Sequence, residues 1–568
     1  MTDLTTPLHR CLLTADVDRI ARYRFDVVVI GTGAAGASVA LSAAARGLRV
    51  AVLGKAPDTK ENNTNWARGG IAAVLDSADS FEDHERDTIN CGVGLCDPTI
   101  VRDVVKGGPV AIERLVRLGA EFDRGGSGDL ELGMEGGHSR RRIVHANGDA
   151  TGRVIQSTLG PAIENNDRIS LFHDVFAIDL VDEEDGRIVG VLVRLASGDL
   201  ACFQAGSTVL ACGGGGQMYR ETTNPVLATA DGVAMAYRAG AQLRDLEFFQ
   251  FHPTCLYIAG AARVLISEIA RGAGGVLRDR DGIRFMPEYH PEADLAPRDI
   301  VSRAAADRMD RTSHANIYLD LTAIDGNPHE LFPSISATCR LFDIDIARQL
   351  IPVRPGAHYM IGGVQADSQG RTSLPGLFAV GECASTGLHG ANRMGSNSLL
   401  EALVLGTRTG DAVEGDLEGT AAPLRKLMHR KDADVSTPVQ VNVTDVLYAM
   451  KSLMWRSVGV RRNADDLVEA NKQLTFWSAA TQRLAPDTIA AWELMNMLTV
   501  ARLATISALE RKESRGAHFR HDYPASEEAW RRHTIIRVHE IAAGHLGEPS
   551  LSHEAVNTAL SSMPVEHA

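Results

Sequence analysis

The segment FDVVVIGTGAAG, residues 25–36, decides the fold of this 568-residue chain. Its first half, ending at Ile30, is a run rich in β-branched residues that predicts a buried strand. A small-residue helix to about Arg46 and a second strand over 48–53 are predicted next. A GxGxxG pattern by itself is compatible with a simple tight turn. Between a strand and a helix, its glycines let backbone N–H groups and a helix N-terminus approach a pyrophosphate. The stretch therefore predicts a Rossmann-like dinucleotide-binding fold.

One position departs from the usual dinucleotide pattern. An acid normally stands about 20 residues after the glycines and binds the ribose hydroxyls. Here Gly54 and Lys55 occupy that place. We therefore expect Lys55 to cover the adenosine side of the site.

Residues far along the chain complete this fold. Residues 209–214 form another apolar strand ending in glycines, and residues 372–382 run from a threonine through a strand to Gly381 and Glu382. Such a second segment closes FAD-binding folds around the ribitol and is lacking in nicotinamide-only dehydrogenases. Just beyond it, His389, Arg393 and Ser398 lie in a glycine-rich loop and the start of a helix. We expect this loop to join a flavin to a small anion, with Ser398 capping the helix.

Composition narrows the class of protein. The 58 Lys and Arg against 72 Asp and Glu give a net charge of −14, which makes nucleic acid an unexpected partner. The eight cysteines form no CxxC pair, so no zinc or iron–sulfur spacing is present, and we expect them to be reduced. The N-terminus lacks the apolar run of a signal peptide, and no stretch reaches the ~18 uncharged apolar residues of a membrane helix. A cytoplasmic protein with no metal and no membrane partner is expected.

Six co-linear motifs resemble the succinate dehydrogenase/fumarate reductase flavoprotein superfamily. They are ARGGI at 67–71, QFHPT at 250–254, PRD at 297–299, HY at 358–359, GE at 381–382 and HGANR at 389–393. The resemblance covers nearly the whole chain. It implies an α/β fold, with a Rossmann-like FAD-binding domain (1–236 and 346–420), an inserted α+β capping domain (237–345) and a C-terminal helical domain (421–568).

Within the superfamily, two features resemble the aspartate oxidase branch. Asn63 stands where the respiratory members carry the histidine that bonds covalently to FAD, so FAD is expected to be noncovalent. The loop EGGHSRRR at 135–142 resembles one that places a carboxylate, here Glu135, near a substrate amine. Glu135 instead pairing with one of the loop arginines is the structural alternative, and the arginines themselves are expected to be loop charge. Arg68 departs from the family, where a glutamine is usual.

The resemblance implies a set of FAD contacts. The glycine-rich turn would hold the pyrophosphate, Lys55 the adenosine side, residues 63–70 the ring's edge, and two acids the rest of the cofactor. The helix N-terminus at Ser398 would stabilise the reduced ring. The cofactor-binding residues are Gly31, Thr32, Gly33, Ala34, Ala35, Gly36, Lys55, Asn63, Thr64, Asn65, Trp66, Ala67, Arg68, Gly69, Gly70, Asp231, Glu382, Ser398 and Leu399.

The resemblance also implies a dicarboxylate site. Arginine suits a carboxylate because its planar fork donates two parallel charge-assisted bonds. Singly, an arginine is more often in a structural ion pair, and a histidine more often a packing residue; their joint match to one pattern favours the functional reading. The substrate-binding residues are Glu135, His252, Ser267, His358 and Arg393, and the catalytic residues are Arg298, Glu268 and His252. His389 is expected to face the dicarboxylate as well.

The implied reaction is hydride transfer from C2 of L-aspartate to flavin N5, giving iminoaspartate. Arg298 would orient the substrate and relay a proton with Glu268, because arginine resists acting as a base. Fumarate or oxygen would reoxidise the flavin, and quinolinate synthase would receive the product on the route to NAD. The alternatives are a soluble fumarate reductase or succinate dehydrogenase flavoprotein subunit, and a flavin-binding regulatory protein without turnover.

Overall fold

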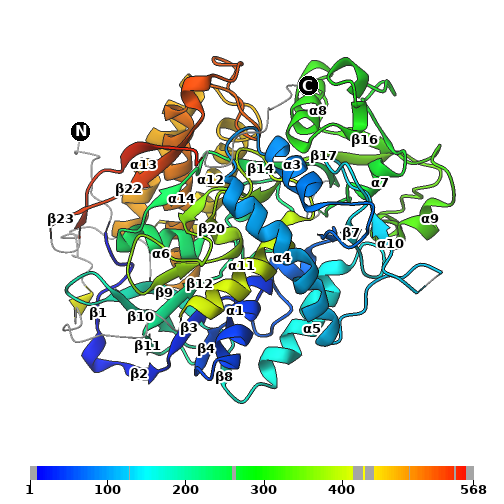
Figure 1. Ribbon diagram of the computed structural model, residues 1–568. Coiled ribbons are helices and arrows are strands. Elements are labelled where there is room, and N and C mark those ends of the chain that lie inside the picture. Colours follow the sequence, from blue (N-terminus) through cyan, green and yellow to red (C-terminus); the bar gives the residue numbers. More distant parts are fainter. Residues whose placement is uncertain are drawn as a thin grey trace.

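A parallel sheet of five strands forms the centre of the molecule (Figure 1). The computed structural model describes residues 9–126, 128–258, 264–413, 427–428, 441–484, 487–542 and 545–557. The sheet has the order β19 (Leu377–Ala379), β12 (Ser207–Leu210), β3 (Val27–Ile30), β4 (Val50–Leu53) and β8 (Ile169–Phe172). The predicted strand, the helix α1 (Ala34–Ala45) and the second strand are thus confirmed. β3 and β4 consist of continuous apolar residues because both faces of this sheet are covered.

The register of these strands brings three distant segments together. Val29 pairs with Val209, and Val209 pairs with Phe378, all in parallel. The carboxyl ends of β3, β12 and β19 therefore meet at one edge of the sheet. The glycine-rich turn after Ile30, the glycines after Leu210 and the acid at Glu382 follow these ends, which is where doubly wound folds bind ligands.

Helix α11 (Asn397–Ala412) packs along α1 (Figure 1). A Cβ atom at Gly406 would lie 2.8 Å from the carbonyl oxygen of Ala35, and one at Gly410 would lie 2.5 Å from that of Val39. These glycines permit the close approach of the two backbones. The packing directs the N-termini of both helices toward the same edge of the central sheet.

Further sheets flank the centre. The sheet β2-β11-β10-β9 comprises Ala21–Arg24, Leu200–Gln204, Ile188–Arg194 and Phe176–Asp182. The sheet β20-β18-β13-β22-β25 comprises Ala384–Ser385, Gly363–Gln365, Leu243–Arg244, Arg532–Arg537 and Ser550–Ala555. Helices α3 (Phe81–Cys91), α4 (Pro98–Arg117), α5 (Thr151–Glu164) and α6 (Asp231–Ala239) complete this part.

The inserted unit has its own sheet and core. Its sheet has the order β14 (Phe249–Leu256), β17 (Ile351–Met360), β16 (Ile317–Asp320) and β15 (Val276–Arg278), with α7 (Ile269–Gly272), α8 (Arg298–Arg311), α9 (Pro328–Leu331) and α10 (Pro333–Arg340) around it. β17 begins after the predicted boundary at 345, yet it pairs with both β14 and β16. Since β14 and β17 also lead back to the central body, the division into domains stays a prediction.

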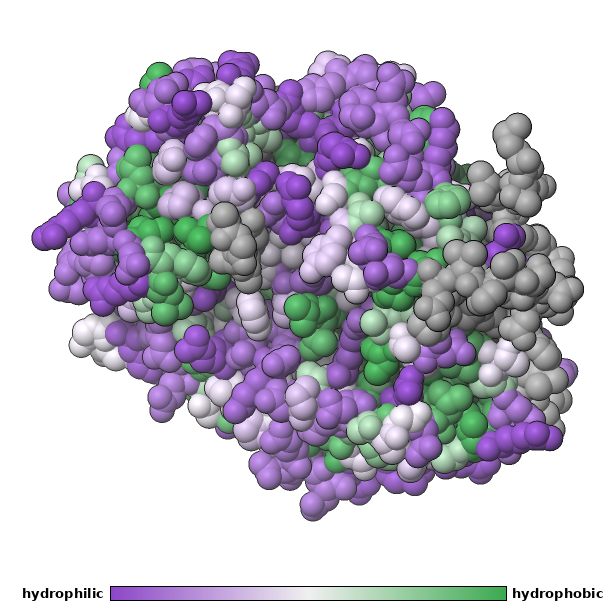
Figure 2. Space-filling model, turned by 180° about the vertical axis from the view of Figure 1, so that it is seen from behind, coloured by the Kyte–Doolittle hydropathy of each residue, from purple (hydrophilic) through white to green (hydrophobic). Residues whose placement is uncertain are grey.

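The C-terminal region contains α12 (Val443–Ser457), α13 (Ala464–Leu484) and α14 (Ile489–Glu510). It is less purely helical than predicted, because β22 joins β13 of the main body and β25 pairs with β22. In the described part of the chain, α14 alone is long and apolar enough to cross a membrane, but 78% of its apolar stretch is buried in the protein. On the face shown in Figure 2, hydrophilic residues cover most of the surface and apolar residues form separate patches.

Candidate active site

A cavity of about 1800 Å³, including space open to solvent, lies at the carboxyl edge of the central sheet. It is lined by residues of the main body, of the inserted unit and of the loop before α11. Most of the predicted cofactor contacts line it: Gly31, Thr32, Gly33, Ala34, Ala35, Lys55, Asn63, Thr64, Trp66, Ala67, Arg68, Gly69, Gly70, Asp231, Glu382, Ser398 and Leu399. Gly36 and Asn65 do not.

The glycine-rich turn leaves room for a ligand that approaches the backbone. Gly31 has φ +120°, and a Cβ atom there would lie 2.2 Å from the carbonyl oxygen of Ala211, so only glycine fits. Gly33 precedes α1 and supplies no side-chain cap. The N–H of Ala34 donates to Thr64 Oγ1 (3.0 Å), and the remaining first-turn N–H groups form the kind of helix end that binds phosphate. The turn therefore fits a pyrophosphate.

Glu382 lies where β12 and β19 end, as a buried carboxylate of the cavity wall. It accepts hydrogen bonds from Asn63 Nδ2 (2.8 Å) and from the Met360 N–H (3.1 Å). Burial raises the pKa of Glu382. The Oδ1 atom of Asn63 is buried and has no partner within the described residues, so this amide retains an acceptor for a ligand.

Lys55 closes the far end of the cavity. Its Nζ atom donates to Asp231 Oδ2 (2.9 Å) and Thr229 Oγ1 (2.7 Å) and contacts Glu493 of α14. Burial lowers the pKa of Lys55, but the two carboxylates outweigh this and raise it above its ordinary value. The lysine stays charged, and acids from two distant segments replace the missing acid after β4.

The opposite end of the cavity gathers all of the predicted substrate and catalytic residues. The lining there includes Glu135, His252, Ser267, Glu268, Arg298, His358 and Arg393. β14 supplies His252, β17 supplies His358, and Arg298 is the first residue of α8. Two arginines, two histidines and two acids thus converge from the inserted unit and from loops of the main body.

Arg298 is held in a chain of alternating charges. Its Nε atom donates to Glu268 Oε2 (2.8 Å), and Arg271 donates to Glu268 Oε1 (2.5 Å). Burial lowers the pKa of Arg298, but the charges of Glu268 and Glu135 outweigh this effect and raise the pKa above its ordinary value. Burial raises the pKa of Glu268, but the two arginines outweigh this effect and lower the pKa to about 2. Arg298 is therefore a cation and Glu268 an anion at neutral pH.

Arg393 is buried and only partly neutralised. Its guanidinium donates to Gln250 Oε1 (3.1 Å) and Ser398 Oγ (2.5 Å) and lies over the Tyr359 ring, 4.6 Å from its centre. Its Nε atom has no partner in the described part of the chain. Burial and the charge of Arg298 lower its pKa to about 10. A buried cation beside a second cation is stabilised by an anionic ligand.

The two histidines of the cavity are neutral donors or acceptors. Burial, and then the charges of Arg298, Arg271 and Arg393, hold the pKa of His252 well below its ordinary value. Its Nδ1 atom accepts from the Thr254 N–H (3.3 Å), which leaves the ring proton on Nε2. Burial also lowers the pKa of His358, whose Nδ1 lies 2.9 Å from Thr223 Oγ1.

Glu135 does not pair with the loop arginines. Its Oε2 atom accepts from Ser396 Oγ (2.7 Å), which comes from the segment before α11. Arg142 instead donates to Asp79 (2.8 Å) and Asp87 (2.6 Å). The arginines were expected to be loop charge. Arg140 is exposed, whereas Arg142 is fully buried in these ion pairs. The carboxylate of Glu135 remains directed to the cavity.

Two expectations about the loop before α11 are wrong. His389 does not line the cavity, because its Nε2 atom is paired with Glu401 (3.1 Å) and its ring packs on Tyr359. Ser398 does not cap α11, which begins at Asn397; its hydroxyl accepts from Arg393 instead. Ser396, at the N-cap position with φ +61°, also makes no cap and bonds to Glu135.

Several residues of the site were not predicted as functional. Gln250 accepts from both Arg298 (3.2 Å) and Arg393 (3.1 Å), and it donates to the carbonyl oxygen of Arg393 (2.6 Å). Its place in the QFHPT motif was the available signal. Tyr359 lies in the HY motif and Ser396 at the predicted helix start, but neither position indicated its partner. Arg271 carried no local signal, because its partner is fixed only by the fold.

Comparisons with known proteins show the family of this chain. A family model described as FAD binding domain matches residues 26–399, and one described as Fumarate reductase flavoprotein C-term matches residues 448–567. L-aspartate oxidase 1 of Ralstonia nicotianae is 43% identical, over 88% of this chain and 96% of that protein. L-aspartate oxidase of Streptomyces coelicolor is 41% identical, over 90% of this chain and 91% of that protein.

Solved structures indicate the same superfamily. A quinol fumarate reductase chain of E. coli superposes with a TM-score of 0.87 at 29% identity, covering 96% of this chain and 99% of that one. The two arginines, the glycine-rich turn and these relatives agree on one assignment. The chain belongs to the L-aspartate oxidase family, within the succinate dehydrogenase/fumarate reductase flavoprotein superfamily.

Proposed function

We propose that this protein oxidises L-aspartate to iminoaspartate with noncovalent FAD. The observation that carries the proposal is the charge pattern at one end of the cavity, where Arg298 and Arg393 stand with the carboxylate of Glu135. L-Aspartate presents two carboxylates and one ammonium group, the complementary pattern. FAD, held by the glycine-rich turn and by Asn63 and Glu382, would supply the acceptor for the hydride from C2, and the substrate ammonium group would lose one proton as the imine forms.

The two guanidinium groups orient the carboxylates. Both donate to Gln250 Oε1, at 3.2 and 3.1 Å, so one side chain bridges the two guanidinium groups. His252 offers its Nε2–H, and Ser267 and His358 add polar groups on the same wall. Holding the substrate rigidly in this way accounts for a large part of the rate in enzymes that bring two reactants together.

Arg298 acts as a cation rather than as a base, because its pKa is raised. It stabilises negative charge on the substrate carboxylate, and together with Glu268 and Arg271 it forms a path along which a proton can pass. Glu135 receives the substrate ammonium group. A buried carboxylate in this place favours aspartate over dicarboxylates that lack an amine to pair with it.

The electron acceptors and the next enzyme also belong to the proposal. Fumarate has the two carboxylates that Arg298 and Arg393 recognise, so it is a second oxidant beside oxygen. Iminoaspartate is unstable in water, and its consumer would be quinolinate synthase on the route to NAD. A cytoplasmic location fits this role, and we propose it for this chain.

A steady-state assay tests the proposal against the fumarate reductase alternative. Purified protein is given L-aspartate with oxygen and then with fumarate as acceptor. Succinate is given with oxygen or an artificial dye as acceptor, because succinate and fumarate together give no net reaction. We expect turnover of L-aspartate with both acceptors and little turnover of succinate. Turnover of succinate without turnover of L-aspartate would establish the alternative.

Noncovalent binding predicts that the cofactor leaves the protein on denaturation. Asn63 donates to Glu382 and its amide is no nucleophile toward a flavin ring. After acid precipitation, we expect all of the flavin absorbance in the supernatant and none in the pellet. Flavin that remains with the washed pellet would contradict the prediction.

The lowered pKa values of His252 and His358 predict a flat pH dependence of dicarboxylate binding. Both rings stay neutral in the folded protein as the pH falls from 8 to 6, so the site gains no charge. In the unfolded chain they take up protons below about pH 6.5, so the free energy of unfolding decreases as the pH falls below that value.

The measurement is the inhibition constant of succinate, taken at several pH values. We expect a change of less than about twofold between pH 8 and pH 6. A tightening of about tenfold per pH unit below 6.5 would show that a histidine titrates at its ordinary pKa.

A further inference from the structure

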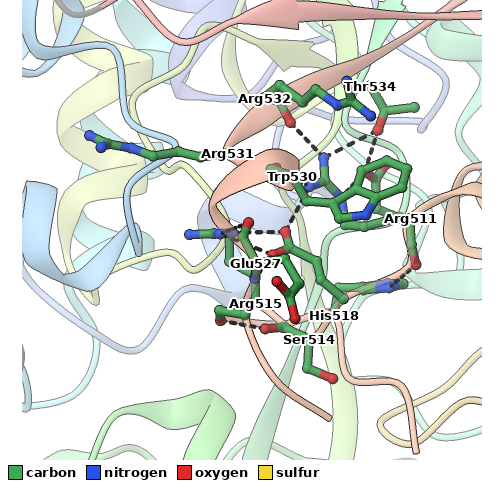
Figure 3. A network of polar contacts seen from close by, with 12 residues as sticks. Arg511, Ser514, Arg515, His518, Glu527, Trp530, Arg531, Arg532 and Thr534 are labelled. Carbon is green, nitrogen blue, oxygen red and sulfur yellow. Dashed lines mark hydrogen bonds and ion pairs between the residues drawn. The ribbon is translucent and has the colours of Figure 1, made fainter. Parts of the chain in front are cut away.

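A network of buried arginines and acids lies outside the cavity, in residues 511–534 (Figure 3). At its centre is Arg511, whose guanidinium offers five N–H donors. All find acceptors: Glu247 Oε1 (2.7 Å), Glu513 Oε1 (2.9 Å), Thr534 Oγ1 (3.2 Å) and the carbonyl oxygens of Trp530 (2.8 Å) and Arg532 (2.8 Å). Arg511, Glu247 and Glu513 are essentially inaccessible to solvent. A buried guanidinium with all five donors bound fixes one local geometry.

The network fixes a tight turn over residues 515–518. Arg515 forms a two-pronged ion pair with Glu513, from Nε (2.8 Å) and Nη2 (2.9 Å). Arg515 and His518 also exchange backbone hydrogen bonds of 2.8 and 3.0 Å. The backbone of Gly516 and Ala517 between them is therefore held from both sides.

This turn presses against the loop that carries Arg393. Gly516 has φ +51°, and a Cβ atom there would lie 2.4 Å from the carbonyl oxygen of Ala391. The N–H of Ala517 donates to that same oxygen (2.9 Å). Ala391 is two residues before Arg393, so its position determines where the guanidinium enters the cavity.

The other side of Ala391 is fixed by the same network. The N–H of Ala391 donates to the carbonyl oxygen of Gly92 (2.9 Å). Arg515 donates to the carbonyl oxygen of Val93 (2.9 Å), and Arg531 donates to that of Gly94 (3.2 Å). The loop that carries Arg393 is thus held between the turn at residues 515–518 and residues 92–94, and arginines of the network bind both of these segments.

The turn also reaches the helix that carries Arg298. Arg303 of α8 donates to the carbonyl oxygen of Gly516 (2.9 Å) and pairs with Asp299 (3.0 Å). The other oxygen of Asp299 accepts from Asn392 Nδ2 (3.0 Å), the residue before Arg393. One turn therefore contacts both elements that bring a guanidinium to the dicarboxylate site.

We infer that the turn at residues 515–518 sets the spacing of Arg298 and Arg393, and that Gly516 and Arg303 are positioning residues for the dicarboxylate. The inference rests on the proposed function, since it concerns the same substrate site. Neither residue lines the cavity. Their contribution passes through contacts with the elements that carry the two arginines, so changing them displaces the arginines without removing them.

Gly516→Ala tests the inference directly. The added Cβ displaces the Ala391 carbonyl, because at 2.4 Å the two atoms overlap. A misplacement of about 1 Å in a catalytic site costs on the order of 100-fold in rate. We expect the KM for L-aspartate to rise at least about tenfold, with the affinity of the apoprotein for FAD, measured by flavin fluorescence, within about twofold of wild type.

Gly186→Ala is the matched control. Gly186 also has positive φ (+87°), and a Cβ atom there meets nothing within 4 Å. It lies in the turn between β9 and β10, away from the cavity lining. The control carries the same kind of backbone strain without the contact to Ala391, so its KM for L-aspartate should equal that of wild type.

Arg303→Ala is the second variant. Because the Arg303 side chain is partly exposed, its removal disturbs folding less than the added Cβ atom at Gly516. It removes the bonds to Gly516 and Asp299, and we expect a severalfold rise in KM with unchanged FAD affinity. If Gly516→Ala gives no folded protein, the KM of Arg303→Ala for L-aspartate tests the inference. A wild-type KM in the folded variants, or an equal change in the control, overturns the inference. A wild-type protein that does not turn over L-aspartate contradicts the proposed function instead.

Discussion

Replacing Arg393 by leucine should raise the KM for L-aspartate on the order of 100-fold or more, while FAD remains bound. The guanidinium is buried, its Nε atom lacks a partner in the described part of the chain, and it stands beside Arg298. A hydrogen bond to a charged group contributes about 1.5–3 kcal/mol, so two lost bonds to a carboxylate amount to at least about 3 kcal/mol. The measurement is the steady-state KM together with the dissociation constant of FAD.

The same variant removes a cation from above Tyr359, so a control for nonspecific effects is needed. Arg408→Leu removes an arginine of α11 that pairs with Asp103 and does not line the cavity. It should keep the wild-type KM. Arg393→Lys keeps the charge but loses the planar fork of arginine. Its KM should lie between that of Arg393→Leu and that of Arg408→Leu. Loss of FAD from Arg393→Leu with an unchanged KM would assign Arg393 to the cofactor instead of the substrate.

Replacing Glu135 by glutamine should damage aspartate oxidation far more than fumarate reduction. The amide oxygen of glutamine still accepts the hydrogen bond from Ser396, so the side chain keeps its place and loses only its charge. Aspartate then lacks the partner for its ammonium group, whereas fumarate has no such group. We expect kcat/KM for L-aspartate to fall on the order of 100-fold, the size expected when a charged hydrogen bond of about 3 kcal/mol is lost.

Fumarate reduction by Glu135→Gln, driven by a chemical reductant, should stay within a few-fold of wild type. Glu131→Gln serves as the control, because Glu131 is an exposed acid four residues earlier in the same region and lies outside the cavity lining. It should leave both reactions unchanged. Equal losses in the two reactions of Glu135→Gln would remove its role in choosing between substrates.

The sequence predicted best where the signal is local. The strand, the glycine-rich turn and the helix around Gly31 follow from apolar periodicity and from the backbone freedom of glycine. The substrate residues were assigned through short motifs, and the fold places all of them, from Glu135 to Arg393, on one cavity. The resemblance to family motifs thus predicted which residues come together. The spacing of these residues along the sequence would not have predicted it.

The errors concern pairs that only the folded chain creates. The acids that pair with the buried Arg142 are Asp79 and Asp87, far earlier in the chain, so the sequence indicated only loop charge for this run of arginines. His389 matched a family motif, but its partner Glu401 lies on the next helix and turns it away from the cavity. β22 joins a flanking sheet of the main body through β13, a pairing across nearly 300 residues that no local pattern indicates.

Reduction of the bound flavin by L-aspartate without oxygen tests the central claim most directly. The holoenzyme is mixed anaerobically with L-aspartate, and the flavin absorbance near its visible maximum is followed in a single turnover. We expect L-aspartate to bleach the flavin completely, and succinate at the same concentration to leave it oxidised, because only aspartate carries the amine that Glu135 recognises. Flavin that stays oxidised with L-aspartate, or that succinate reduces as readily, would contradict the assignment.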